Sequence, residues 1–252
     1  MRRDRAARSG AVLFLHNLAF DEIIDRIADI KHRFNSALVI GAPNEEWADC
    51  IGEMTTNVTV IDPGKLFAEA ADGIQAVEDE LDLEPGSFDL CIAIGTLDTV
   101  NDLPGALLRI RFLLRPDSLL IGAISGGNNL PRLRQAMRAA DGAMGAASPH
   151  AHPRIEPAAL AQLLGAAGFS MPVVDVERQQ VAYREFAQLV RDLRGMGATN
   201  ILHSRSRKAI TRAGLAAAEA EFQFGPDERT VETFEVLHFA AWSPASRPPK
   251  EG

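Results

Sequence analysis

Along most of the chain, segments whose apolar residues recur at helical spacing alternate with short apolar runs typical of strands. The apolar run 37–40 and the β-branched run 57–62 have the length of strands, and a glycine or a Pro-Gly pair follows each. Between residues 18 and 31, apolar side chains recur at helical spacing: Leu18, Ile23, Ile24, Ile27 and Ile30. These segments predict a helix followed by β-α units.

The same alternation continues towards the C-terminus. A weakly marked strand is predicted near 74–80, and the apolar run at 86–97 is typical of a strand buried on both faces. Further predicted elements are a helix and strand within 102–125, helices at 130–144 and 157–169, a strand at 171–183 and a last strand at 229–242. Alternating strands and helices indicate an α/β fold with a mostly parallel sheet.

The chain shows no internal repeat and no clear domain boundary. We therefore predict a single domain over 1–252, with an N-terminal helical arm at 1–32. Residues 183–224 are helical in pattern and lie between two strands, which predicts a helical cap inserted before the last strand. Residues 243–252 are rich in proline and polar side chains and are expected to form a flexible tail.

Composition and charge limit the classes of partner. The chain has 252 residues, of which 46% are hydrophobic, enough to bury the core of one large domain. A formal net charge of -8 argues against nucleic-acid binding and favours a protein or a small molecule as partner. Basic runs at 1–8 and 203–212 still allow a local contact with an anionic group.

Cysteine and histidine usage predicts neither a disulfide framework nor a metal site. Cys50 and Cys91 are the two cysteines, and the histidines lack the spacing of metal ligands. No apolar run approaches the roughly 20 residues of a membrane span. The N-terminal segment lacks the features of a signal peptide, so a cytoplasmic location is expected.

Two residues at strand ends carry the strongest chemical signals. Gly41 follows the strand at 37–40, at a turn where a side chain would collide with a ligand or with the returning helix. Asp62 ends the next strand, where a carboxylate can accept hydrogen bonds from a ligand. The alternative for Asp62 is a solvated turn residue ahead of Pro63.

Several motifs in order resemble the class I S-adenosylmethionine-dependent methyltransferases. They are the glycine turn, the acid-ended second strand, the block 86–126 and the closing "FEVLHFAAW". Within that family, the chain is similar to the branch of the malonyl carrier-protein methyltransferase of biotin synthesis and the assembly factor of respiratory complex I. The motifs pointing to that branch are "RRDRAAR", "NNLPRLRQAM" and "RDLRGMGATN".

The resemblance implies a Rossmann-like sheet of seven strands, with the last strand antiparallel and a helical insert before it. It also implies S-adenosylmethionine as cofactor, lying across the carboxyl ends of the first strands. Gly41 and Ala42 would form the turn, Asp62 would bind the ribose, and Glu78 or Asp79 would meet the adenine edge. Ile94, at the end of the fourth strand, is also assigned to the cofactor site.

The glycine turn departs from the pattern of the family. Pro43 and Glu45 stand where relatives carry glycines, and Val39 replaces an acid of the first strand. Proline removes a backbone donor, and Glu45 brings a negative charge towards a cofactor that carries a carboxylate. A degenerate cofactor site is therefore the alternative to a working one.

The candidates for the substrate side are weaker. Asp98 is placed after the fourth strand, where it could face the pocket or cap a helix, whereas capping is favoured for Asp102. His203 and Arg205 lie in the predicted cap, where polar side chains could reach a substrate. By resemblance, the arginines of the N-terminal arm would belong to a lid over the cofactor.

Together these features predict a methyltransferase-like protein that acts on a protein or carrier-protein substrate, or in the assembly of respiratory complex I. The alternative is a non-enzymatic assembly or interaction protein that retained the fold. A dinucleotide-dependent oxidoreductase is disfavoured because the G-x-G-x-x-G spacing is absent.

Overall fold

The continuous apolar run predicted as a buried strand forms β4 (Phe88–Ile94), and all seven of its residues are buried. It pairs in parallel with β1 (Ser36–Ile40) on one side and with β5 (Leu114–Ser125) on the other. The computed structural model describes residues 2–145, 147–150, 152–223 and 229–245. Within the described residues, β4 lies at the centre of the sheet, and its side chains are apolar except for Asp89, as suits a strand covered on both faces.

The sheet contains seven strands in the order β3-β2-β1-β4-β5-β7-β6. The last strand, β7 (Thr230–Trp242), is antiparallel to both β5 and β6 (Ser170–Tyr183), and the other pairings are parallel. This arrangement confirms the predicted sheet. β2 (Asn57–Asp62) matches its apolar run, but β3 (Ile74–Gln75) is shorter than the predicted strand at 74–80, since only these two residues pair with β2.

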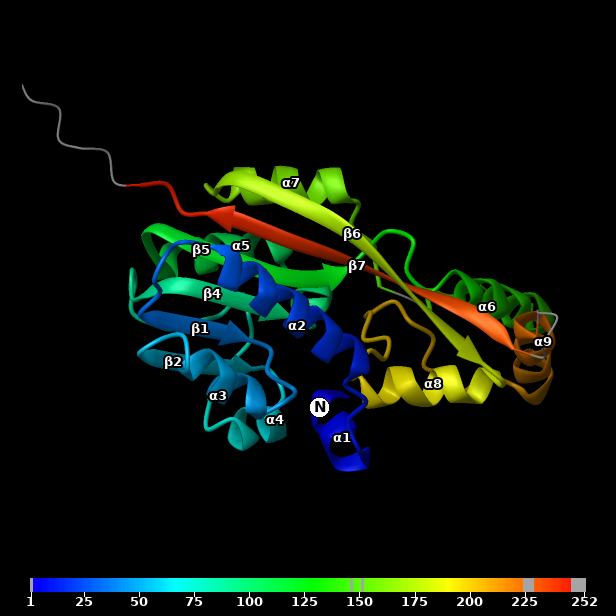
Figure 1. Ribbon diagram of the computed structural model, residues 1–252. Coiled ribbons are helices and arrows are strands. Elements are labelled where there is room, and N and C mark those ends of the chain that lie inside the picture. Colours follow the sequence, from blue (N-terminus) through cyan, green and yellow to red (C-terminus); the bar gives the residue numbers. More distant parts are fainter. Residues whose placement is uncertain (1, 146, 151, 224–228, 246–252) are drawn as a thin grey trace, which may run out of the picture.

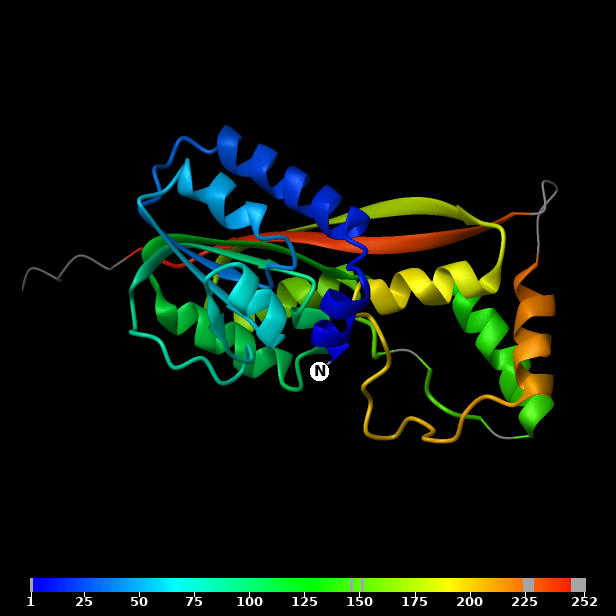
Figure 2. The same ribbon diagram turned by 90° about the horizontal axis from the view of Figure 1, so that it is seen from below.

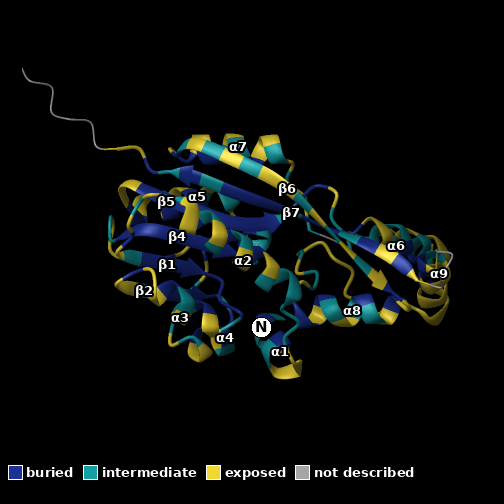
Figure 3. Ribbon diagram, viewed as in Figure 1, coloured by how far each residue is buried: buried dark blue, intermediate teal, exposed yellow. Residues whose placement is uncertain are grey.

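Helices cover both faces of the sheet (Figures 1 and 2). Successive strand residues face opposite sides, so Val39 and Ile92 belong to one buried cluster and Leu38 and Cys91 to the other. Figure 3 shows the central strands as the most deeply buried part of the molecule. The covering helices are α2 (Phe14–Asp29) and α3 (Glu46–Gly52) on the first side, and α5 (Leu103–Leu113) and α7 (Pro157–Ala166) on the second.

The paired strands β6 and β7 extend beyond the rest of the sheet and carry a second group of helices (Figure 1). These helices share an apolar cluster that includes Tyr183, Leu189 and Phe234. They are α6 (Pro131–Met144), α8 (Phe186–Gly195) and α9 (Arg212–Phe222). The predicted cap at 183–224 thus corresponds to α8 and α9, and α6 joins it from an earlier part of the chain.

The two ends of the described chain are held against the body of the protein. Ser243, in the predicted tail, is buried and its amide donates to the carbonyl of Ser118 at 2.8 Å. Residues 246–252 of that tail lie outside the described residues. At the other end, α1 (Arg2–Ser9) contacts α8 and α4 (Lys65–Ala70). In the described part of the chain, no helix is long and apolar enough to cross a membrane.

Candidate functional site

The turn after β1 is shaped by a close approach of backbone to backbone. Gly41 has a φ of +81°, and its amide donates to the carbonyl of Ile61 at 2.9 Å. A Cβ at this position would lie 2.6 Å from Cγ2 of Thr96 and would also meet the carbonyl of Ile94. Glycine is therefore required here by the chain's own packing as well as by conformation.

Asp62 lies at the end of β2 and is fully buried. The amide of Ala42 donates to its Oδ2 at 3.1 Å, and the amide of Gly64 donates to its Oδ1 at 2.7 Å. The solvated turn residue considered for Asp62 is therefore wrong. Its carboxylate joins the turn after β1 to the turn after β2, which brings Gly41, Ala42 and Asp62 together as the resemblance implies.

A second pair of bonds reaches Asp62 from α1. Arg3 is buried, and its Nε donates to Oδ1 of Asp62 at 2.7 Å while Nη2 pairs with Oδ2. The guanidinium also lies 5.0 Å from the ring centre of Phe67, and Nη1 donates to the carbonyl of Gly95 at 3.3 Å. Arg3 therefore crosses the carboxyl ends of the strands from β2 to β4.

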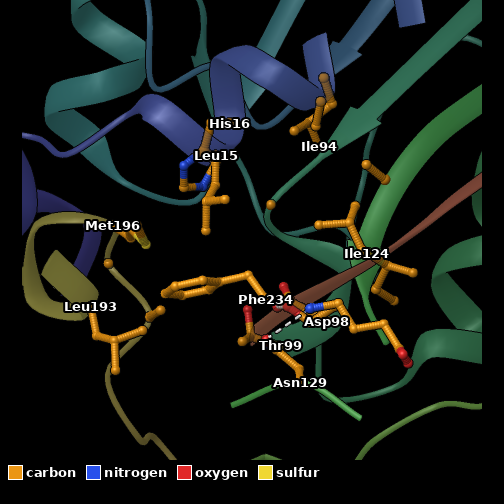
Figure 4. A pocket seen from close by; sticks show the side chains of 18 of the residues that line it. Leu15, His16, Ile94, Asp98, Thr99, Ile124, Asn129, Leu193, Met196 and Phe234 are labelled. Carbon is orange, nitrogen blue, oxygen red and sulfur yellow. Dashed lines mark hydrogen bonds between the residues drawn. The ribbon is translucent and has the colours of Figure 1, made fainter. Parts of the chain in front are cut away.

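A cavity of about 110 Å³ opens beyond the ends of β4 and β5 (Figure 4). Leu15, Leu193, Met196 and Phe234 give it apolar walls, with Ile94 and Ile124 at the strand ends. Its polar lining includes Arg2 on α1, His16 on α2, and Asp98 and Thr99 after β4, and it is completed by Ser125, Asn129 and Glu235. An apolar cavity with a few convergent polar groups is the usual form of a small-molecule site.

His16 is the most perturbed titratable group of this cavity. Burial, followed by the charge of Arg3, lowers the pKa of His16 to about 4, so the ring is neutral near neutral pH. Its Nδ1 has no hydrogen-bond partner among the described residues, although it is buried. From the sequence, this histidine was considered only as a possible metal ligand, for which its spacing is wrong. The one available signal was a polar pair, His16 and Asn17, that interrupts an apolar run.

Asp98 faces the cavity and does not cap a helix. Its Oδ2 accepts the hydroxyl of Ser125 at 2.9 Å. The predicted cap at Asp102 is confirmed, since its Oδ1 accepts the amide of Gly105 at 3.0 Å at the start of α5. Beside Asp98, Nη2 of Arg2 bonds to the hydroxyl of Thr99, and Nη1 of Arg2 is buried without a partner among the described residues.

A second cavity, of about 330 Å³, lies on the other side of the α1 arginines. Glu78 and Asp79, assigned to the adenine edge, line it together with Pro63 and Gly64. Glu78 is buried, its Oε1 has no partner among the described residues, and burial raises its pKa. Asp79 is partly exposed. Arg2 and Thr99 line both cavities and therefore stand between them.

His203 and Arg205 do not join this site. Both are exposed in the loop between α8 and α9, which runs outside α8 (Figure 2). Arg205 lines another groove, of about 1020 Å³, between that loop, α6 and α8. The sequence did not predict the position of this loop, because its course depends on how α6, α8 and α9 pack at the end of the paired strands β6 and β7.

Polar groups suited to a ligand such as S-adenosylmethionine lie at both ends of the strand edge, and Arg2 and Arg3 lie between them. Four buried polar atoms around this edge lack partners among the described residues: Nδ1 of His16, Nη1 of Arg2, Oε1 of Glu78 and Oγ1 of Thr96. Buried polar atoms without a partner are typical of a site that binds a ligand or water.

The glycine turn departs from the family pattern at Pro43 and Glu45. Pro43 is buried, while Glu45 is exposed and lines none of the three cavities described above. Among described residues, no cluster of His, Cys, Asp or Glu suits a metal ion.

Comparisons with known proteins agree with this geometry. A family model described as a methyltransferase domain matches residues 14–172. The mitochondrial arginine hydroxylase NDUFAF5 of Danio rerio is 31% identical, over 95% of this chain and 79% of that protein. The malonyl-[acyl-carrier protein] O-methyltransferase of Laribacter hongkongensis is 35% identical, over 73% of this chain and 61% of that protein. Among solved structures, YcgJ of Bacillus subtilis covers 90% of this chain and 99% of its own, with a TM-score of 0.60 at 10% identity, a likeness of fold alone.

Proposed function

Because the chain belongs to the methyltransferase domain family, we propose that it binds S-adenosylmethionine at the carboxyl ends of β1, β2 and β4 and acts on a group carried by a protein. The observation that carries the proposal is the meeting of Gly41 and Asp62 at adjacent strand ends, with cavities on both sides. When bound, the cofactor would supply an activated methyl group.

Different residues would bind the adenine, the ribose and the reacting group, according to their positions along the strand edge. Glu78 and Asp79 would meet the adenine edge in the larger cavity, and Asp62 would meet the ribose. The cavity of about 110 Å³ would receive the reacting group, because it lies beyond β4 and β5 and contains His16 and Asp98. His16, being neutral, can accept a hydrogen bond there, and the apolar walls would exclude water.

The substrate class follows from the size of that cavity and from the relatives. A volume of about 110 Å³ admits one side chain or a short acyl group but no larger part of a protein. The two relatives named above are an arginine hydroxylase and a methyltransferase of malonyl-[acyl-carrier protein]. A protein-borne group that reaches into the cavity fits both. A role in respiratory complex I assembly and a cytoplasmic location stay predictions.

Isothermal titration calorimetry with S-adenosylmethionine, S-adenosylhomocysteine and, as a control ligand, NAD⁺ tests the proposal. We expect saturable heat for the two sulfur compounds and none for NAD⁺. A second arm offers malonyl carrier protein with S-adenosylmethionine labelled in its methyl group and measures transfer of the label to the carrier protein. The Arg3→Ala variant, in which no guanidinium binds Asp62, is titrated as well. If neither sulfur compound binds the wild type or this variant, the protein is a non-enzymatic member of the family.

A further inference from the structure

The carboxylate of Asp62 has no acceptor capacity left for a ribose. It receives four hydrogen bonds, two from Arg3 and one each from the amides of Ala42 and Gly64. A carboxylate offers about four lone-pair sites in total. A ribose hydroxyl can therefore donate to Asp62 only when an existing donor leaves. The two amides belong to the turns that hold the strand ends, so the Arg3 side chain is the donor that can move.

Contacts with the turn after β2 and with α4 hold Arg3 and the rest of α1 in place; we call these contacts the α1 seat. A Cβ on Gly64 would lie 2.6 Å from Cβ of Arg3, so glycine at this position lets α1 approach the turn after β2. The ring of Phe67 lies under the guanidinium. Next to it, Oδ1 of Asp4 accepts the amide of Leu66 at 3.0 Å in the first turn of α4. These contacts hold α1 across the strand ends at more than one point.

The α1 arginines also divide the site. Arg2 bonds to Thr99, and these two residues line both the smaller and the larger cavity. A ligand that extended from Glu78 on one side to His16 on the other would have to pass where Arg2 and Arg3 now lie. The unpartnered polar atoms of Glu78 and His16 stand on opposite sides of this barrier.

We propose that α1 is an internal competitor of the cofactor: Arg3 occupies the ribose-binding carboxylate of Asp62, and the cofactor binds only when α1 moves off the strand ends. This inference rests on the function proposed above and concerns the regulation of the same site. The measured affinity is then the intrinsic affinity multiplied by the fraction of molecules in which Asp62 is free of Arg3. Weakening the α1 seat should raise that fraction.

Three variants test the competition by titration with S-adenosylhomocysteine. Arg3→Ala removes the competing guanidinium, and we expect its affinity to exceed that of the wild type by about tenfold. Asp4→Ala weakens the α1 seat without touching Asp62, and we expect a smaller gain in the same direction. Arg5→Ala is the matched control, because Arg5 is an exposed arginine of the same helix, and its affinity should equal that of the wild type.

Hydrogen–deuterium exchange of the wild type gives an independent result that does not depend on a variant folding. With saturating S-adenosylhomocysteine, the amides of α1 should exchange faster, because the helix leaves its seat. A lid that closed over the cofactor would instead be protected. Adenosine, which carries the ribose, should produce the same acceleration, and methionine should not.

Each outcome decides between the proposals. Higher affinity for Arg3→Ala and Asp4→Ala with faster α1 exchange supports the competition, as does binding by Arg3→Ala when the wild type shows none. Equal or lower affinity of both variants, or protection of α1, overturns the competition and leaves the proposed function standing. Absence of binding by the wild type and all variants overturns the proposed function as well.

Discussion

At the level of single residues, two buried carboxylates beside the same strand edge differ in how their charge is satisfied. Asp62 receives four donors. Glu78 is equally enclosed, but its Oε1 has no partner among the described residues. Burial raises the pKa of Glu78 above its ordinary value, because the charged form loses water that nothing fully replaces. Ionisation of Glu78 therefore costs free energy in the folded protein.

This contrast predicts a pH-dependent effect of Glu78→Gln. The folded-state pKa of Glu78 is raised, so its contribution to the free energy of unfolding is complete below its ordinary value of 4.5. The contribution is lost as pH rises through the raised pKa. Glutamine does not ionise. Raising the pH from about 4 to about 8 should therefore increase the free energy of unfolding of the variant relative to that of the wild type.

Urea unfolding of both proteins at these two pH values measures the difference. Asp79→Asn is the matched control, because this neighbouring acid is partly exposed. A difference between wild type and Glu78→Gln that does not change with pH would show that Glu78 stays ionised in the folded protein without penalty.

At the level of elements, two helices begin with carboxylate caps of different origin. Asp102 caps α5 from the adjacent residue, as its sequence position predicts. The first turn of α6 is held by Glu232, which belongs to β7 and is fully buried. Its two oxygens accept the amides of Arg132 at 3.1 Å and Leu133 at 2.7 Å. Glu232 therefore fixes the second helical group to the antiparallel ribbon.

Removing the two caps should have unequal effects. Glu232→Ala leaves two amides of α6 without their acceptor, so we expect it to lower the free energy of unfolding by about 3 kcal/mol. Asp102→Ala removes an exposed cap with one such bond, and we expect a loss of about 1 kcal/mol. Urea denaturation followed by circular dichroism compares them. Equal losses would mean that water replaces Glu232 at the start of α6.

At the level of the whole molecule, the protection of Cys91 reports on the intact sheet. Cys91 lies in the fully buried β4, and burial raises the pKa of its thiol. Cys50, on α3, is half-buried. Reaction of a thiol with a disulfide reagent requires access and the thiolate form. Access to Cys91 requires separation of helices from a face of the central strand.

We therefore expect Cys91 to react with a chromogenic disulfide reagent only when the protein unfolds. Cys50→Ser leaves Cys91 as the single thiol of the chain. Its labelling, measured by absorbance across a urea series, should follow the same transition as circular dichroism. Fast labelling in the absence of urea would show that β4 becomes accessible through local opening.

The strands and most helices could be predicted because their signals are local. A strand covered on both faces is mostly apolar, as β4 is apart from Asp89, and an antiparallel closing strand follows from the family motifs around "FEVLHFAAW". The ends of the first two strands were also found, because a glycine turn and a strand-end acid are short patterns. Gly41, Ala42 and Asp62 do meet in the structure.

The partners of these residues depended on contacts between distant parts of the chain. Arg3 lies 59 positions from the aspartate it binds, and no local pattern distinguishes it from exposed Arg5. His16 became a buried neutral ring because α2 packs it against Gly95, whereas His203 stayed exposed because its loop runs outside α8. Hydrophobic spacing determines which face of an element is buried, so the sequence alone could predict the sheet. Tertiary packing determines which polar group is buried next to which, and it alone placed Arg3 on Asp62.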